Sequence, residues 1–278
     1  MLNAITIDVE DYFHPSEVQA SVSPDRWNSM NSRVDRATDR CIELLARHQT
    51  KGTFFILGWV ARKSPKLVRR IVDAGHEIAC HSYWHRLVYD LTPEEFRQDT
   101  LDAVAAIGDA CGVRPTAYRA PSYSITQRSW WALDVLASLG FTHDSSVFPI
   151  THDRYGVPGY SRAAVMEKTP SGPILEVPPA TAKLSETRMA PVAGGGYLRM
   201  FPYAYTAAGI RRLNAEGMPA CVYFHPWEID PGQPRLLTGL SGIRTYMGLA
   251  KMERKLDRLL HEFRFTTFGA VYPLPAAA

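Results

Sequence analysis

The sequence predicts an α/β protein whose parallel sheet is closed, or nearly closed, into a barrel. Segments patterned as strands and as helices alternate along the chain up to residue 144. Polar side chains follow several of the expected strands, and α/β barrels place their active sites at the carboxyl ends of strands. The 278 residues are enough for one such domain. We therefore predict a single domain over residues 1–278, with a helical extension at about residues 240–278.

The expected strands are short apolar runs, several of which end in a polar residue. They cover residues 2–9, 53–57, 78–80, 116–119, 142–144, 174–179 and 222–224. The expected helices are amphipathic segments with capping residues at their ends. They cover residues 33–48, 65–74, 92–110, 126–139 and 246–263. Thr92 before Pro93 is typical of a helix N-terminus, and Gly75 of a helix end. Residues 194–199 are rich in glycine but lack the spacing of a nucleotide-binding loop, so we interpret them as a flexible rim loop.

Composition restricts the class of protein and its partners. With 46% hydrophobic and 21% charged residues, the chain is ordinary globular protein. The net charge of +3 is too small to indicate nucleic acid or an anionic membrane as a partner. No apolar run is long enough for a membrane span, and the N-terminus lacks the pattern of a secretory signal. The four cysteines are widely spaced in apolar surroundings, so we expect them to be reduced and the protein to be cytoplasmic.

Two histidines separated by three residues, His81 and His85, are the first candidate metal ligands. On one face of a helical turn, both imidazoles would reach one metal ion. A short apolar strand that ends at Cys80 runs into the pair, as a strand would run into a site at its carboxyl end. The alternative is a pair of surface or capping histidines, and Cys80 itself is a less favoured ligand.

Three carboxylates follow the first expected strand. Asp8 and Glu10 lie on the same face of an extended segment, whereas Val9 points into the core. Acids at the end of a buried strand are costly unless cations face them. A metal bound by two histidines needs an anionic third ligand, and a second carboxylate could take a proton from its water. Glu10 and Asp11 are both candidates for the ligand. The alternative is a solvated acidic loop or a helix N-cap.

Further polar residues follow three other expected strands. Arg119, in a segment stiffened by Pro121, would keep a neighbouring carboxylate base ionised and oriented. His225, after the late strand at residues 222–224, would serve as a general acid. Asp144 is a carboxylate at another strand end. The alternatives are an ordinary surface arginine and a buried histidine with its hydrogen bonds satisfied.

These segments, in this order, resemble the motifs of the polysaccharide deacetylase superfamily, which includes chitooligosaccharide and peptidoglycan deacetylases. The resemblance is carried by Asp8 and the acids after it, the pair at residues 81–85, Arg119-x-Pro121-x-Tyr123, the segment 144–146 and His225. It covers about residues 4–228, most of the chain. The opening at residues 8–14 and the ending at residues 225–228 are similar to the subgroup found in bacterial exopolysaccharide and exosortase-associated gene clusters.

The resemblance implies a distorted (β/α) barrel and a role for each residue. Asp8 would be the general base and Arg119 the residue that holds it, with His225 as the general acid. His81 and His85 would bind a divalent metal, which is zinc in most of this family. Family members commonly have two adjacent aspartates where this chain has Asp8 and Val9, so the carboxylate ligand must be Glu10 or Asp11. We favour Glu10. The expected substrate-binding residues are Tyr123, Pro121, Trp227 and Asp144.

The resulting hypothesis is a metal-dependent hydrolase that removes acetyl groups from N-acetylated sugars of a polysaccharide or its precursor. Its partners would be an N-acetylated carbohydrate and, from the subgroup, the polysaccharide biosynthesis machinery, without nucleic acid and without a membrane span. The sequence leaves two alternatives. One is an allantoinase-like hydrolase of a small cyclic amide that works without the usual metal, which Val9 favours. The other is a non-catalytic carbohydrate-binding member, which the complete set of polar residues argues against.

Overall fold

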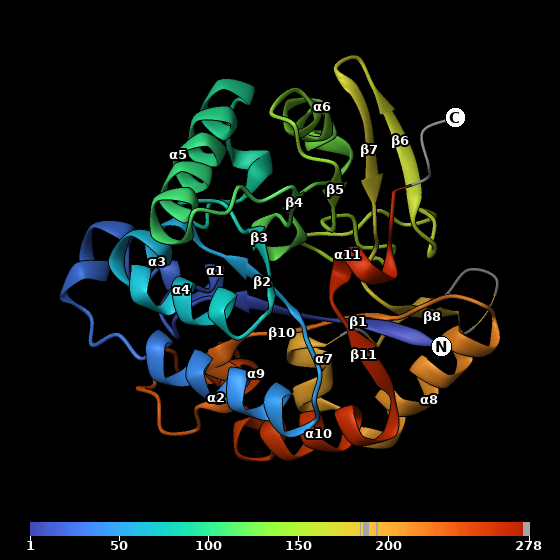
Figure 1. The fold of residues 1–278 in the computed structure, drawn as a ribbon. Coiled ribbons are helices and arrows are strands. Elements are labelled where there is room, and N and C mark those ends of the chain that lie inside the picture. The colour runs from blue at the N-terminus through green and yellow to red at the C-terminus, as the bar shows by residue number, and fades with distance from the viewer. Residues whose placement is uncertain (184, 186–188, 193, 275–278) are drawn as a thin grey trace.

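The fold is organised around a mostly parallel sheet of nine strands (Figure 1). This computed structural model describes residues 1–183, 185, 189–192 and 194–274. The strands of the large sheet are β1 (Leu2–Val9), β2 (Thr53–Ile56), β3 (Glu77–Cys80), β4 (Ala117–Tyr118), β5 (His143–Asp144), β6 (Val165–Thr169), β7 (Gly172–Glu176), β10 (Cys221–Phe224) and β11 (Arg264–Thr266). Two short strands, β8 (Thr181–Lys183) and β9 (Met189–Pro191), form a separate antiparallel pair.

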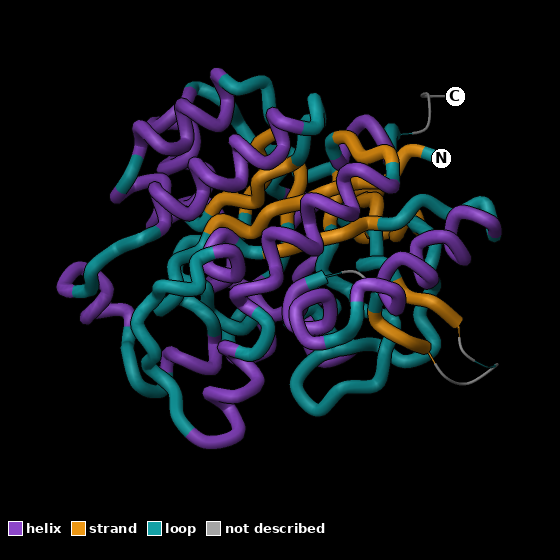
Figure 2. Tube along the Cα trace, turned by 90° about the horizontal axis from the view of Figure 1, so that it is seen from below, coloured by secondary structure: helices purple, strands orange, loops and turns teal. Residues whose placement is uncertain are grey.

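Helices connect the strands and surround them (Figure 2). The α-helices are α1 (Ser16–Gln19), α2 (Val34–Arg47), α3 (Gly58–Lys63), α4 (Pro65–Asp73), α5 (Pro93–Cys111), α6 (Trp131–Ser138), α7 (Gly195–Met200), α8 (Tyr203–Ala215), α9 (Gly239–Tyr246), α10 (Leu249–Glu262) and α11 (Phe268–Val271). The 3-10 helices are η1 (Pro24–Ser29), η2 (Val88–Asp90), η3 (Pro121–Tyr123), η4 (Gln127–Ser129) and η5 (Pro226–Ile229). No helix in this described part of the chain is both long and apolar enough to cross a membrane.

Strand β1 pairs in parallel with β2, β10 and β11. Its side chains alternate between two cores, as the pleat of a strand requires. Ile5 and Ile7 pack in the large core that includes residues of the helices, whereas Ala4 packs in a second, smaller core. That smaller core collects one residue from each of several strands, among them Phe55 and Ala79. The sheet is therefore curved enough to enclose an interior, as a barrel does.

The hydrogen-bonded order of the large sheet is β10-β1-β2-β3-β4-β5-β7-β6, with β11 attached to β1. Among the described residues, no ladder joins the β6 edge to the β10 edge. Single contacts lie beside β10 instead: the Ala180 N–H donates to the Cys221 carbonyl at 3.0 Å, and Gly194 forms an isolated bridge with Tyr223. The α/β fold is as predicted, and the barrel is distorted where irregular chain replaces regular strands.

Most predicted elements are present with shifted ends, and the exceptions lie in the second half. Residues 194–199, expected as a loop, mostly belong to α7. That expectation was wrong because tertiary packing buries Leu198 and Arg199. This packing stabilises the helix despite the low helix propensity of its glycines. The described part of the predicted extension, residues 240–274, contains α9, α10 and α11, and it also supplies β11 to the sheet. Residues 275–278 of that prediction lie outside the described residues. That the whole chain is a single domain remains a prediction.

Gly194 is the glycine whose replacement should damage the fold most clearly. A Cβ atom there would lie 1.7 Å from the Tyr223 carbonyl oxygen, and the residue has φ of +140°. We expect Gly194→Ala to lower the free energy of unfolding by about 2 kcal/mol or more, because the bridge to β10 must separate. Gly108→Ala, in open space on α5, should instead raise it by about 0.5–1 kcal/mol. Urea unfolding of the two variants and the wild type measures both changes, and equal effects would contradict this account.

Candidate active site

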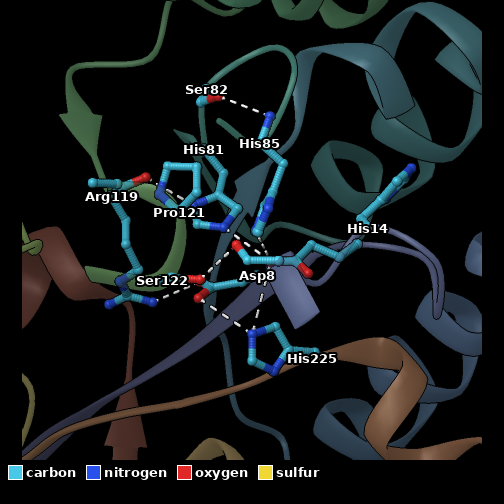
Figure 3. Close-up of polar contacts among 12 residues, drawn as sticks. Asp8, His14, His81, Ser82, His85, Arg119, Pro121, Ser122 and His225 are labelled. Carbon is cyan, nitrogen blue, oxygen red and sulfur yellow. Dashed lines mark hydrogen bonds and ion pairs between the residues drawn. The ribbon is translucent and has the colours of Figure 1, made fainter. Parts of the chain in front are cut away.

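The polar residues that follow the parallel strands meet at one end of the sheet (Figure 3). They line a cleft of about 670 Å³ whose floor includes Asp8, Glu10, His81, His85 and His225. These residues come from the ends of β1, β3 and β10. In the sheet, β10 lies beside β1, and β3 is separated from β1 by β2. The prediction that the site residues gather at the carboxyl ends of strands therefore agrees with where the structure places them.

Glu10, His81 and His85 form a cluster with the chemistry of a metal site. Their potential ligand atoms all lie within 4.8 Å of one another, and all three residues are buried. The Nε2 atoms of His81 and His85 each lie 3.0 Å from the Glu10 Oε1 atom. Burial raises the pKa of Glu10, but the neighbouring histidines outweigh it and hold that pKa well below its usual value. Glu10 is therefore a carboxylate at neutral pH, as a ligand must be.

The ring of His81 is oriented by the backbone of the neighbouring strand end. Its Nδ1 atom lies 2.8 Å from the Arg119 carbonyl oxygen, so Nδ1 carries the proton and donates it there. Nε2 is then left with a lone pair that faces Glu10. Fixing the tautomer through the other ring nitrogen is how proteins commonly prepare a histidine for a metal.

His85 is placed by a loop and not by the helical turn that the spacing predicted. Ser82 and His85 both have positive φ, +64° and +53°, which an α-helix does not allow. Asp99 of α5 holds the loop by accepting the N–H groups of Tyr83 at 2.8 Å and Trp84 at 3.2 Å. The Ser82 hydroxyl accepts the His85 N–H. The two imidazoles still converge, because these contacts stabilise a backbone that the sequence spacing alone would not favour.

Asp11, the alternative carboxylate ligand, has a structural role. Its Oδ2 atom accepts hydrogen bonds from the Ser32 hydroxyl and from the N–H groups of Arg33 and Val34, where α2 begins. Its Oδ1 atom accepts the Tyr12 N–H. Both oxygens are thus occupied, and Asp11 does not join the cluster with the histidines. The assignment of Asp11 as a ligand is wrong, since the period of two along the extended chain brings Glu10 and not Asp11 to the face of Asp8.

Asp8 is held by a buried arginine. Arg119 Nη1 donates to Asp8 Oδ1 at 2.7 Å, and both side chains are almost fully buried. Arg119 also donates to the Thr6 hydroxyl and to Ser145. The second oxygen of Asp8, Oδ2, faces the cleft and lies 3.9 Å from His225 Nε2. One oxygen is therefore fixed and the other is available for proton transfer.

His225 belongs to a chain of charges that the sequence did not reveal. Its Nδ1 atom lies 3.0 Å from Glu228 Oε2, and Glu228 Oε1 accepts from Arg199 Nε at 2.9 Å. Burial lowers the pKa of His225, but Glu10 and Glu228 outweigh it and raise that pKa to about 9. The i,i+3 spacing of His225 and Glu228 on a short 3-10 turn was the available signal. Arg199, 26 residues before His225 in the sequence, gave none.

The cleft walls are aromatic. Tyr123 and Trp227, both predicted, line it together with Tyr155, Tyr197 and Tyr223. The Trp227 ring is stacked on His225 at a centroid distance of 5.2 Å. The buried Tyr123 hydroxyl has no hydrogen-bond partner among the described residues. Such walls suit the apolar faces of sugar rings, and an unpaired buried hydroxyl suits a polar group of a ligand.

The two remaining predicted substrate-binding residues lie outside the cleft lining. Pro121 is buried in η3 and shapes the turn that presents Ser122 and Tyr123. Asp144 is fully buried, and its Oδ1 atom accepts from the Ser146 hydroxyl at 2.6 Å. Both were assigned as substrate contacts, and the structure contradicts this because neither lines the cleft. A residue at the carboxyl end of a strand lies at the same end of the sheet as the cleft. Its position does not decide whether its side chain is exposed to the cleft.

Asp144 is instead one of two adjacent buried carboxyl groups. Glu176 interacts with it, and burial together with the charge of Asp144 raises the pKa of Glu176 well above its usual value. Glu176 Oε1 accepts the N–H groups of Ser146 and Val147. Two negative charges in contact inside the fold are strongly unfavourable, so burial and mutual repulsion favour a proton on one of the two carboxyl groups.

This pair should make the protein less stable at alkaline pH. The proton on Glu176 stabilises the folded state fully at pH values below the ordinary pKa of glutamate. This stabilisation is lost as the pH rises from that value to the raised pKa of Glu176 in the folded protein. Within that range the free energy of unfolding should fall by about 1.4 kcal/mol per pH unit for one proton. Urea unfolding across this range should show a flatter profile for Glu176→Gln, whose amide cannot ionise. The surface control Glu216→Gln should keep the wild-type slope, and a wild-type slope in Glu176→Gln would refute the assignment.

The cluster of Glu10, His81 and His85 fits a catalytic divalent metal by its donor set. Two imidazole nitrogens and one carboxylate oxygen are the ligands of an open zinc site, which keeps a further position for water. Ligand atoms of a tetrahedral zinc ion are about 3.3 Å apart, close to the 3.0 Å between Glu10 Oε1 and each Nε2. Cys80, considered as a further ligand, does not belong to the cluster. It is one of four free cysteines, Cys41, Cys80, Cys111 and Cys221.

Two family models match the chain next to one another. Residues 27–143 match the polysaccharide deacetylase family, and residues 145–273 match a domain of unknown function, DUF3473. The first range contains His81, His85 and Arg119, and the second contains His225. Asp8 and Glu10 precede both ranges, yet the fold brings them to the same cleft.

Curated relatives carry deacetylase names. A chitooligosaccharide deacetylase of Bradyrhizobium is 36% identical over 102 residues, which are 36% of this chain and 44% of the relative. One of Sinorhizobium fredii is 31% identical over 143 residues, 50% of this chain and 64% of the relative. A peptidoglycan-N-acetylglucosamine deacetylase of Bacillus cereus is 27% identical over 147 residues, 49% of this chain and 52% of the relative. The chain thus spans about half the length of these relatives.

Solved structures share the fold at low sequence identity. A crystal structure from Mycobacterium smegmatis, assigned to the polysaccharide deacetylases, has a TM-score of 0.63 at 21% identity and covers 95% of this chain and 85% of its own. A CE4 family pseudoenzyme from Bacillus anthracis has a TM-score of 0.50 at 15% identity and covers 97% of this chain and 64% of its own. Over residues 27–143 the chain is thus similar to the polysaccharide deacetylase family, and the solved structures show that the two share a fold.

Proposed function

We propose that this protein is a metal-dependent hydrolase that removes acetyl groups from N-acetylated sugars of a polysaccharide or its precursor. The observation that carries the proposal is that a candidate base, Asp8, and a candidate acid, His225, lie beside one candidate metal cluster. His225 Nε2 lies 3.9 Å from Asp8 Oδ2 and 3.8 Å from Glu10 Oε1. A hydrolase needs a base, an acid and an electrophilic centre within reach of one bond, and this cleft brings residues for all three together.

Glu10, His81 and His85 would hold the metal, and we propose zinc because the donor set is nitrogen-rich and of low coordination number. When bound, the ion would make its water more acidic and polarise the acetamide carbonyl. Glu10 also argues against the alternative of a metal-independent hydrolase. That alternative was based on Val9 in the place of a second acid, and Glu10 supplies the missing carboxylate at the two histidines.

Asp8 is the proposed general base. Arg119 donates to Oδ1 and fixes it, which leaves Oδ2 to accept a proton from the attacking water. The oxygen of that water adds to the carbonyl carbon of the acetamide. The Asp8–Arg119 pair is buried, so its geometry is maintained without competition from solvent.

His225 is the proposed general acid. Glu228 accepts the Nδ1 proton, so Nε2 is the nitrogen that presents a proton to the cleft. As the carbon–nitrogen bond breaks, His225 would protonate the departing sugar amine and acetate would leave. Burial lowers the pKa of His225, but without the metal Glu10 and Glu228 outweigh burial and raise that pKa to about 9. Glu228, which is not among the proposed metal ligands, would still favour the protonated ring when the metal is bound.

The turn at residues 119–123 offers a donor for the developing oxyanion. The N–H groups of Arg119, Ala120 and Tyr123 already donate to Cys80, Ser146 and Ala120. Pro121 has no N–H group, so Ser122 is the residue of this turn whose N–H has no partner among the described residues. Ser122 has φ of +50°, a strained conformation that the surrounding turn maintains beside the cleft.

The substrate class is supported by the aromatic cleft and by what the relatives are named for, chitooligosaccharide and peptidoglycan N-acetylglucosamine. We extend the proposal to bacterial exopolysaccharide biosynthesis from the resemblance of residues 8–14 and 225–228 to that subgroup. Tyrosines and Trp227 line the cleft in addition to the residues of the metal cluster. The cleft can therefore hold more of a saccharide than its acetamide group.

The decisive experiment is acetate release from N-acetylglucosamine oligosaccharides by metal-stripped protein, before and after zinc is added. We expect zinc to restore activity to the wild type. We expect His81→Ala to bind zinc about 10- to 100-fold more weakly or worse and to remain inactive, because the site loses one of three ligands. The control His261→Ala removes an exposed histidine away from the cleft and should behave as wild type. Zinc binding is measured by competition with a chelating dye.

Asp8→Asn separates binding from catalysis in the same assay. It should bind zinc as the wild type does and lose acetate release by about 10²-fold or more, since its amide cannot accept the proton. Full activity of the metal-free protein would refute the metal-dependent mechanism. A protein that binds both zinc and oligosaccharide but releases no acetate from any N-acetylated sugar would indicate the carbohydrate-binding alternative.

Glu228→Gln should reduce turnover about 10- to 100-fold while the KM changes little, because Gln no longer stabilises the protonated ring of His225 or fixes its tautomer. The alkaline limit of the pH–rate profile should move to lower pH, since Glu228, one of the three carboxylates that raise the pKa of His225, is removed. Steady-state kinetics across pH measures both. Glu167→Gln, which alters a carboxylate bonded to Tyr160 outside the cleft, is the control. An unchanged profile would remove Glu228 from the mechanism.

A further inference from the structure

Helix α9 turns large apolar side chains toward solvent. Leu240 is 75% exposed, Ile243 is 55% exposed and Met247, at the helix end, is 49% exposed. Their spacing of three and four residues places them on one side of the helix. Single exposed apolar residues are common, but a contiguous stripe is not, and such stripes mark surfaces that bind something apolar. We call these three residues the α9 stripe.

The other residues of α9 pack against the fold or line the cleft. Gly242 is buried, with so little room that a Cβ atom would lie 2.6 Å from the Leu237 carbonyl oxygen. The Tyr246 hydroxyl accepts the N–H groups of Leu236 and Leu237. Ser241 and Thr245 line the active-site cleft. The orientation of α9 is therefore fixed on its inner sides, and the α9 stripe is held outward.

A basic groove of about 600 Å³ adjoins the C-terminal end of α9. Met247 of the stripe lines it, as do Arg235, Lys251 and Lys255, and no acidic residue does. Residues 231–252 contain three cations and no Asp or Glu. Arg235, Arg244 and Lys251 are exposed, and none of them forms an ion pair within the described residues. This region is locally positive although the net charge of the chain is only +3.

We propose that the α9 stripe and the basic groove together form a docking surface for a lipid bilayer that contains anionic phospholipid. An amphipathic helix with an apolar face flanked by Lys and Arg binds in the interfacial region of such bilayers. Apolar side chains enter the acyl boundary while the cations contact lipid phosphates. The charge is the observation that selects this occupant. Arg235, Arg244 and Lys251 are exposed beside the apolar stripe, and no carboxylate lines the groove, so the surface complements an anionic partner.

Docking in this way would place the cleft at the membrane surface. The same helix that carries the α9 stripe contributes Ser241, Arg244 and Thr245 to the cleft wall (Figure 1 shows α9 beside α7). Buried Arg199 of α7 donates to the carbonyls of Arg244 and Met247 at 2.8 and 2.9 Å, and also binds Glu228. A saccharide held at a bilayer would therefore meet a cleft whose rim is tied to the docking helix.

The test is flotation of the full chain with vesicles of phosphatidylcholine, with and without phosphatidylglycerol. We expect binding only to the vesicles with phosphatidylglycerol, weakened by salt because the charges are exposed. Leu240→Ser/Ile243→Ser should reduce binding at least about 10-fold. Arg235→Gln/Lys251→Gln should reduce it roughly 25-fold at low salt, since each basic residue near the surface contributes about fivefold.

Matched controls lie elsewhere on the surface. Leu101→Ser removes an apolar side chain of α5 that is 39% exposed, and Lys66→Gln/Lys168→Gln removes two exposed cations. Both should bind vesicles as the wild type does. Thermal unfolding checks that every variant is folded, and none of the substituted residues lines the cleft. Because vesicle binding is the measured quantity, the result does not depend on the proposed enzymatic activity.

Three outcomes would overturn the proposal. The first is binding that does not depend on phosphatidylglycerol. The second is wild-type binding by the α9 stripe variant. The third is a wild-type dimer that becomes a monomer in Leu240→Ser/Ile243→Ser while no form binds vesicles, which would assign the stripe to a second copy of this chain.

Discussion

The buried charge of Arg119 is the constraint on which the active site depends. A guanidinium inside a fold must be paired and fully hydrogen-bonded, because an unpaired one is strongly destabilising. Its partners come from separate strands: Asp8 of β1 and Ser145 after β5, with the Phe55 ring of β2 at 4.1 Å. The carbonyl of Arg119 also receives the Nδ1 proton of His81. One residue thus positions the proposed base and orients one of the proposed metal ligands.

The charges of the cleft show why Glu10 is the carboxylate suited to a metal. Asp8 has Arg119 as its fixed cation, and Glu228 has Arg199. Among the described residues, the ion-pair partners of Glu10 are imidazoles, whose charge depends on protonation. A buried carboxylate without a permanent partner is unfavourable in water-excluded surroundings, and a divalent cation between it and two neutral histidines removes that cost. The same arrangement leaves His225 facing Glu10 from the other side, where a proton donor is needed.

Much of the site could be predicted because strand geometry is local. Alternation along β1 puts Asp8 and Glu10 on one face whatever surrounds them, and the carboxyl ends of parallel strands converge. The helix N-terminus at Thr92 is likewise local, and its capping box with Glu95 is present. Predictions failed where distant contacts decide. Asp99 of α5 holds the loop of His85 out of a helical turn, and Asp144 is buried beside Glu176 of β7 and does not line the cleft.

The sequence by itself determined the residue types, their order and the strands that present them, because these follow from composition and from the periods of extended and helical chain. Only the tertiary structure decided which side chains share a partner. Arg199 meets Glu228 and the end of α9 through the packing of α7, which buries a glycine-rich segment as a helix. The outward stripe of α9 is equally a product of packing, since a sequence pattern marks an apolar face but not whether another element covers it.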